Sequence, residues 1–193
     1  FENFFISILR GSGLNGLVSL DKKTQKNQVN LIRPLIDFDK KDLIYISNYI
    51  FDSYVNDPSN EDDKFKRVRI RNFLKQLGAE GLDRNKFLLT IKNLKSANET
   101  IKFYTKKNLD NNVTFLKKKK YVILKNSFFF NSSEVVFRSF SEVIKIVGKK
   151  YHPVRGKKIV NITQLINDKP SFKVTLGGCV IKKINETVIV SKE

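Results

Sequence analysis

The chain has 193 residues, of which 40% are hydrophobic; 16 are Phe, and Met and Trp are absent. This composition excludes a disordered chain and allows one ordinary domain or two small ones, of which we favour two. The net charge of +18 is large for this size, and a polyanion is the usual partner of such a surface. Nucleic acid is therefore the favoured partner class. The alternative is a lysine-rich proteome that places Lys wherever solvent allows.

Positive charge is concentrated in the second part of the chain. Residues 1–78 hold 13 Lys and Arg against 10 Asp and Glu, a net charge of +3, whereas residues 79–193 hold 24 against 9, a net charge of +15. The single cysteine, Cys179, excludes an internal disulfide and indicates a reducing compartment, so we expect a cytoplasmic protein. No apolar run approaches the roughly 20 residues of a membrane span, and we expect no membrane partner.

The first third of the chain is expected to be helical. Apolar residues recur at helical spacing over residues 1–9 and stop at a glycine turn at residues 10–13. Residues 14–29 are polar and irregular, which predicts a loop with a short helical piece. A second helix takes Asp37 or Asp39 as its cap, and its apolar side chains are predicted to point inward: Leu43, Ile44, Ile46, Ile50 and Phe51.

A third helix carries a stripe of cations. In the turn at residues 56–60, Pro58 fixes φ, and Ser59 or Asn60 is expected to cap the helix that follows, which Gly78 ends. One side of this helix is apolar, with Ile70, Phe73, Leu74 and Leu77. At 100° per residue, a basic stripe lies beside it: Lys64, Arg67, Arg71 and Lys75.

The rest of the chain predicts a long helix and then a mixed unit. Asp83 caps a helix that extends to about Leu109 and is expected to join two domains. Ser133 is expected to cap a further helix that Gly148 ends, and a shorter helix follows at about 160–166. The residue patterns predict strands at 113–116, 121–124, 127–130, 172–175, 179–184 and 187–190, with a charged turn at 117–120.

The predicted fold class is α+β. We expect a helical part at residues 1–78, a helical linker at residues 79–112 and a small domain with short antiparallel strands at residues 113–193. Because the chain lacks Met and opens directly on an apolar run, we expect it to be a fragment of a longer protein.

Catalytic and cofactor motifs are scarce. With one His and one Cys, a metal cluster or a Cys-His nucleophile is not expected, so His152 is interpreted as a loop residue and Cys179 as a core residue. Glycine-rich segments occur at residues 11–13 and 177–178, and neither has the Lys-Ser/Thr ending that holds phosphates. We therefore expect no complete ATP site and no metal site here.

Two segments carry the functional signal. Residues 10–17 read Arg-Gly-Ser-Gly-Leu-Asn-Gly-Leu, a backbone that can approach a ligand closely, although the residues alone favour a simple helix stop. Residues 57–60 read Asp-Pro-Ser-Asn and are followed by Arg67, Arg69 and Arg71. Arginine suits bidentate recognition of carboxylate or phosphate, so three Arg within five residues of a lysine-rich chain indicate that geometry matters. From spacing alone, a solvated face and a functional role explain this stripe equally well.

At these segments the chain resembles the tRNA(Ile)-lysidine synthetases. Glu2 matches the last Glu of the family's Asp-Asp-Gln-x-Glu-Thr motif, with Asn3 in place of Thr, and residues 10–17 match its Arg-Gly-Ser-Gly-Leu-x-Gly-Leu motif. Residues 32–35 are similar to its Arg-Pro-Leu stretch. Residues 57–60 and 67–71, which read Asp-Pro-Ser-Asn and Arg-Val-Arg-Ile-Arg, are similar to its Asp-Pro-Ser-Asn and Arg-Asn-Arg-Ile-Arg blocks. Residues 175–179 are similar to the tail of its short members. Residues 79–170 match loosely.

The resemblance implies an ATP-dependent carbon-nitrogen ligase. In the family, ATP adenylates the C2 carbonyl of the wobble cytidine, C34, of the isoleucine tRNA with a CAU anticodon. The ε-amine of L-lysine then displaces AMP, which changes the codon read from AUG to AUA. The resemblance also implies Mg²⁺. The family's Ser-Gly-Gly-x-Asp-Ser loop has no match in this chain, so we expect the chain to be the C-terminal portion, inactive alone.

Site roles follow from the resemblance at matching positions. Glu2 and Arg67 are expected to receive the lysine substrate, a carboxylate for its ammonium and a guanidinium for its carboxylate. The expected tRNA contacts are Arg10, Lys64, Arg69, Arg71 and Lys75, while the basic second domain grips the tRNA stem through its phosphates. The oligomeric state is left open, a homodimer included. A non-catalytic basic RNA-binding module is the main alternative, and another member of the same ATP-pyrophosphatase superfamily is a weaker one.

Overall fold

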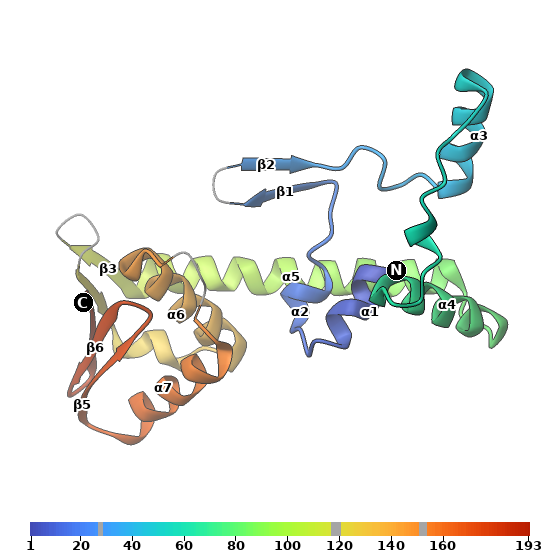
Figure 1. The fold of residues 1–193 in the computed structure, drawn as a ribbon. Helices are drawn as coiled ribbons and strands as arrows, with labels where there is room; N and C mark the ends of the chain where they lie inside the picture. Colours follow the sequence, from blue (N-terminus) through green and yellow to red (C-terminus); the bar gives the residue numbers. More distant parts are fainter. Residues whose placement is uncertain (27–28, 117–120, 151–153) are drawn as a thin grey trace. The chain divides into compact units, whose positions relative to one another are not determined.

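Helices and two antiparallel sheets make up the fold, which confirms the predicted α+β class (Figure 1). The computed structural model describes residues 1–26, 29–116, 121–150 and 154–193. His152 and the charged turn predicted at residues 117–120 lie outside these described residues. The chain divides into two compact units, Phe1–Asn98 and Glu99–Glu193, and the division falls within the long helix α5 (Arg84–Asn112).

The first unit contains short helices and one hairpin. Its elements before α5 are α1 (Glu2–Ile8), α2 (Leu14–Leu17), β1 (Lys23–Lys26), β2 (Val29–Ile32), α3 (Lys40–Phe51), the 3₁₀ turn η1 (Pro58–Asn60) and α4 (Lys66–Ala79). The helices α1 and α2 were predicted. The antiparallel β1–β2 hairpin was not, because the side chains of β2 are exposed and therefore show no alternation of buried and solvated positions.

The predicted inward face of α3 is wrong. No residue of this helix is buried, and Ile46, Ile50 and Phe51 expose 45%, 60% and 71% of their surface. Of the two predicted caps, Asp37 and Asp39, the structure has Asp39. Its backbone N–H donates to Asp42 Oδ2 at 3.2 Å in a capping box.

Both predicted ends of α4 are also wrong. The helix begins after Phe65, and Ser59 and Asn60 belong instead to η1, where the Asp57 side chain accepts from the Ser59 N–H at 2.9 Å. At the other end α4 continues through Gly78, and Gly81 takes the left-handed conformation with φ of 97°. The Leu82 N–H donates to the Leu77 carbonyl at 2.8 Å, which closes the helix five residues back.

Aromatic side chains hold the core of the first unit. Phe1, Phe4 and Phe5 of the α1 segment surround Phe87 of α5, with ring centroids 4.6, 5.1 and 5.7 Å from it. Phe5 also meets Phe73 of α4 edge to face at 6.3 Å. Since α1 packs against α4, this cluster fixes the start of α1 beside the basic stripe of α4.

The second unit is a five-stranded antiparallel sheet with two helices. Its strands lie in the order β3-β4-β7-β6-β5. The elements are β3 (Val113–Leu116), β4 (Tyr121–Leu124), the 3₁₀ turn η2 (Asn126–Phe130), α6 (Ser133–Gly148), α7 (Gly156–Asp168), β5 (Ser171–Leu176), β6 (Cys179–Ile184) and β7 (Thr187–Lys192). The predicted strands are confirmed apart from the one at residues 127–130, which is η2.

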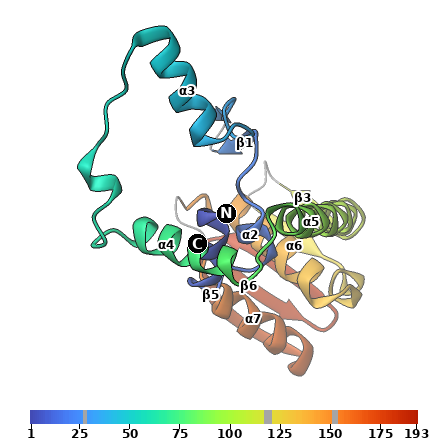
Figure 2. The same cartoon turned by 90° about the vertical axis from the view of Figure 1, so that its right-hand side faces the viewer.

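Helices α6 and α7 cover one face of this sheet (Figure 1 and Figure 2). Val122, Val190 and Ile181 are partners across three strands, and each is completely buried. The helices contribute buried side chains to the same core, namely Phe140, Val143, Ile144, Val147, Ile159, Ile162 and Ile166. Asn108 of α5 is also buried here, and its amide donates to Ser139 Oγ and the Phe128 carbonyl, both at 3.2 Å.

The β5–β6 turn packs tightly against the end of α6. Gly177 and Gly178 join the two strands with φ of 62° and 77°, the left-handed conformation that a two-residue hairpin turn of type I′ requires at both positions. A Cβ on Gly148 would lie 2.1 Å from the Gly177 carbonyl oxygen. Gly148 was predicted to end α6, but it is the last residue of the helix itself. The residue that ends the helix is Lys149, which has φ of 51°.

Cys179 behaves as the core residue that its sequence position predicts. It is completely buried, and burial raises the pKa of its thiol to about 11. At pH 8 only about one thiol in a thousand would be ionised, so we expect iodoacetamide to alkylate the folded chain very slowly. Adding denaturant should accelerate the alkylation by at least a hundredfold, as followed by mass spectrometry. Rapid alkylation without denaturant would contradict a packed β5–β6 turn.

Candidate functional site

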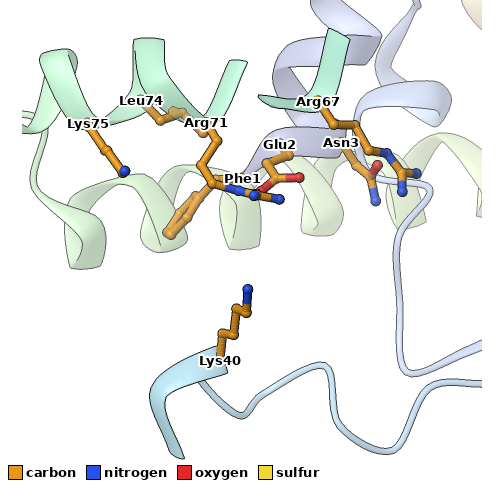
Figure 3. Close-up of a pocket in the computed structure, with 8 residues that line it drawn as sticks. All are labelled: Phe1, Glu2, Asn3, Lys40, Arg67, Arg71, Leu74 and Lys75. Carbon is orange, nitrogen blue, oxygen red and sulfur yellow. The ribbon is translucent and has the colours of Figure 1, made fainter. Parts of the chain in front are cut away.

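The first unit contains an open pocket of about 590 Å³. Its lining comes from the start of α1, from α4 and from the first residue of α3: Phe1, Glu2, Asn3, Lys40, Arg67, Arg71, Leu74 and Lys75. Figure 3 shows Glu2, Arg67 and Arg71 grouped along one side, with Lys40 pointing toward them from α3. Four of the seven predicted site residues, Glu2, Arg67, Arg71 and Lys75, therefore line one cavity.

Helical spacing explains how α4 supplies half of this lining. Arg67, Arg71, Leu74 and Lys75 follow one another at intervals of four, three and one, so they share one face of the helix. At 100° per residue, Val68 and Ile70 lie on the two flanks of this face, and both are buried, which orients the helix and keeps its basic stripe in solvent. Lys64, also predicted on the stripe, precedes the helix and does not line the pocket.

Lys40 enters the pocket because its neighbour is anchored. Asp39 accepts two hydrogen bonds from the Arg84 guanidinium, at 2.5 and 2.6 Å, in a bidentate pair between the start of α3 and the start of α5. The hydrogen bond with Arg84 lowers the pKa of Asp39, and the pKa of Arg84 is raised in return. Because Lys40 is the next residue, this pair determines where its ammonium can reach.

Glu2 and Arg71 form an ion pair inside the pocket. Arg71 Nε donates to Glu2 Oε1 at 2.9 Å, with both side chains about one third exposed, and Arg71 also donates to the Asn60 carbonyl at 3.3 Å. The second bond connects the pocket to the Asp-Pro-Ser-Asn turn. Within that turn, hydrogen bonds from Ser59 to the Asp57 carboxylate lower the pKa of Asp57.

Three cations of the pocket remain uncompensated. Lys40, Arg67 and Lys75 have no ion-pair or hydrogen-bond partner among the residues that the structure describes. Glu2 is the single carboxylate of the lining, and Arg71 already neutralises it. The cavity is therefore a cationic site with one acidic group at its edge.

The remaining predicted residues lie outside the cavity. Arg69 donates to the Asp63 and Lys64 carbonyls at 2.8 and 3.0 Å, so it holds the loop before α4. Arg10 is exposed in the turn after α1. Sequence reasoning missed Asn3 and Lys40 as pocket residues, and the capping residue Asp39 was the only signal near Lys40.

The described residues do not fit Mg²⁺. Within the described parts of the chain, His, Cys, Asp and Glu form no group of three or more that could hold a metal ion. Mg²⁺ prefers several oxygen ligands, whereas the pocket offers one carboxylate that is already paired. Among the described helices, none has the length and apolar character needed to cross a membrane.

Comparison with known proteins gives a match to a family model and matches to individual relatives. A family model described as a PP-loop domain matches residues 1–77, which contain every residue of the pocket. Beyond this segment, relatives named tRNA(Ile)-lysidine synthase match the whole chain. The protein from Wolbachia sp. subsp. Brugia malayi is 29% identical over 194 residues, and that from Wolbachia pipientis wMel is 28% identical over 194 residues.

The matches cover the relatives only in part. Both Wolbachia alignments take in 100% of this chain and 45% of the relative, so the chain spans a little under half the length of these curated relatives. A Bradyrhizobium diazoefficiens protein of the same name is 35% identical over 104 residues, which are 54% of this chain and 29% of that protein.

Proposed function

We propose that this chain is part of an ATP-dependent tRNA(Ile)-lysidine synthetase and that its pocket receives the lysine substrate. The observation that carries the proposal is the pocket itself, in which Glu2 and Arg67 lie at one edge of a solvent-open cavity within the PP-loop match. The whole protein would ligate lysine to C34 of the isoleucine tRNA with a CAU anticodon and change its decoding from AUG to AUA. We propose that it works in the cytoplasm.

The two charges suit a free amino acid. Arg67 has no partner among the described residues, so its guanidinium can bind the lysine carboxylate in a bidentate manner. Glu2 uses Oε1 to accept from Arg71, and a carboxylate has a second oxygen, which can accept from the lysine α-ammonium. The side chain of the substrate would then carry its ε-amine, the nucleophile, away from this edge.

ATP and Mg²⁺ belong to the remainder of the proposed enzyme. The described residues include neither a phosphate-binding loop nor a group of metal ligands, and the chain spans 45% of its Wolbachia relatives. In the proposed reaction ATP makes the C2 oxygen of the cytidine a leaving group. The chain's own residues hold lysine and RNA, so we propose that the chain alone is inactive.

We further propose that residues 113–193 bind the tRNA stem, with residues 79–112 as a helical linker. The second unit, Glu99–Glu193, holds 20 Lys and Arg against seven Asp and Glu. An excess of cations of this size suits the phosphates of A-form RNA, which proteins read by shape rather than by base edges. In the first unit, Arg10, Lys64, Arg69, Arg71 and Lys75 are the proposed contacts near the anticodon.

Replacing Arg67 with Ala in the full-length enzyme tests the lysine assignment. We expect the KM for lysine to rise about tenfold or more, because a charge-assisted bidentate pair is lost. The KM for ATP should change less than about twofold. Steady-state kinetics with each substrate varied in turn would measure both.

Lys66→Ala is the matched control, since Lys66 is the preceding residue on α4 and does not line the pocket. It should leave both constants near their original values. Equal effects of Arg67→Ala on lysine and on ATP would contradict a lysine site at Glu2 and Arg67. They would favour a role of Arg67 that is not specific to lysine.

A further inference from the structure

The charge of the pocket exceeds what a lysine substrate needs. A zwitterionic amino acid requires one cation for its carboxylate and one anion for its ammonium, which Arg67 and Glu2 supply. Lys40 and Lys75 remain, and neither has a partner among the described side chains. Both lysines are exposed and line the same cavity, so they give it positive charge that an anionic ligand would compensate.

We propose that Lys40 and Lys75 form a phosphoryl-binding subsite in this pocket. Figure 3 shows Lys75 at one end of the cavity and Arg67 at the other, with Lys40 approaching from the opposite wall. A phosphoryl group fits because ammonium groups bind it as point charges, without the planar geometry that a carboxylate pair with Arg uses. This proposal rests on the proposed function in one respect only, which is that the neighbouring site binds lysine.

The fold positions Lys40 for this role. The bidentate Asp39–Arg84 pair anchors the start of α3 to the start of α5, and the capping box between Asp39 and Asp42 fixes the first turn. Neither acidic residue lines the pocket, so neither neutralises Lys40 within it. Asp39 and Arg84 are therefore positioning residues, and Lys40 is the residue that contacts the ligand.

Two sources could supply the phosphoryl group. One is the RNA backbone beside the modified nucleotide, and the other is a free phosphate such as pyrophosphate or AMP. Both present the same oxyanion to the lysines. The openness of the cavity admits either, so separate binding measurements with each ligand distinguish them.

The test measures binding of two probes to the 193-residue chain, with no catalytic readout. Inorganic pyrophosphate is titrated by calorimetry, and an RNA hairpin with a CAU loop by fluorescence anisotropy, both at an ionic strength of about 0.1 M to suppress long-range attraction. We expect Lys40→Gln and Lys75→Gln each to weaken at least one probe about three- to tenfold, and the double variant to weaken it further. Lys40→Arg should retain most of the affinity.

Matched controls separate the subsite from general positive charge. Lys41→Gln and Lys66→Gln remove one charge from the same helices, and neither residue lines the pocket. These variants should bind within about twofold of the unchanged chain. Circular dichroism would verify that every variant keeps its helices.

Each outcome decides the proposal. A pocket-specific loss with pyrophosphate indicates a free phosphate, and a pocket-specific loss with the hairpin alone indicates the RNA backbone. Equal losses in pocket and control variants, or no binding of either probe, would overturn the subsite. Since lysine is absent from these titrations, their failure leaves the Arg67 result untouched, and failure at Arg67 leaves the subsite standing.

Discussion

Replacing Gly148 with Ala is expected to lower the free energy of unfolding of the second unit by about 3 kcal/mol, because overpacking against a backbone atom cannot be relieved by a rotamer change. The added Cβ would lie 2.1 Å from the Gly177 carbonyl oxygen and 3.0 Å from Cys179 Sγ. The carbonyl is held in the β5–β6 turn, where Leu176 and Cys179 pair across the strands. Either α6 must shift from the sheet or the turn must open.

Gly156→Ala is the control within the same unit. Its Cβ would meet only the Phe137 ring, at 3.4 Å, an ordinary contact, so we expect a change within about 0.5 kcal/mol. Urea denaturation followed by circular dichroism would measure both variants. If Gly148→Ala were as stable as Gly156→Ala, the close approach of α6 to the turn would be wrong.

Prediction from sequence succeeded for strands in which packing on a core makes buried and solvated side chains alternate. Residues 113–116, 121–124 and 179–184 were predicted as strands with the bounds that the structure has. In β4, β6 and β7, buried and solvated side chains alternate because one face packs on α6 and α7. The β propensity of Phe128 and Phe130 led to the wrong prediction of a strand at η2. Propensity is a local property, and it does not show that the Phe128 ring is buried while the Phe130 ring is 79% exposed.

The first unit was less predictable because burial constrains it less. The helix α3 has an apolar composition without any buried residue, so an inward face could not be deduced correctly. At the pocket, Arg67, Arg71 and Lys75 were found by helical spacing, since they share α4. Lys40 was missed because its place depends on a contact between Asp39 and Arg84, 45 residues apart, which no local pattern reports.

The affinity of the chain for RNA should depend steeply on salt, and the largest share of that dependence should come from one basic segment. Residues 149–158 hold five cations and no carboxylate. Lys149 and Lys150 follow α6, while Arg155, Lys157 and Lys158 lie at the start of α7, and all five are exposed. Lys150 also packs against the β5–β6 turn, since its Cε lies 2.7 Å from where a Gly178 Cβ would be.

Changing these five residues to Gln is expected to weaken binding of an RNA stem roughly a hundredfold at low salt. For each phosphate contact that is lost, binding releases about one counterion fewer. The slope of log affinity against log salt should therefore become shallower by about two to four. Anisotropy titrations from about 50 to 200 mM KCl would give both quantities. The unchanged chain should lose about a thousandfold across that range.

The control removes the same charge from the first unit. Five exposed lysines outside the pocket are changed to Gln together: Lys23, Lys41, Lys66, Lys86 and Lys92. If the stem is bound locally by the second unit, this variant should lose less than about tenfold, because charges that make no phosphate contact act only through a screened field. Equal losses in the two variants would mean that net charge alone attracts RNA. A slope that did not change with the basic segment would place the phosphate contacts elsewhere on the second unit.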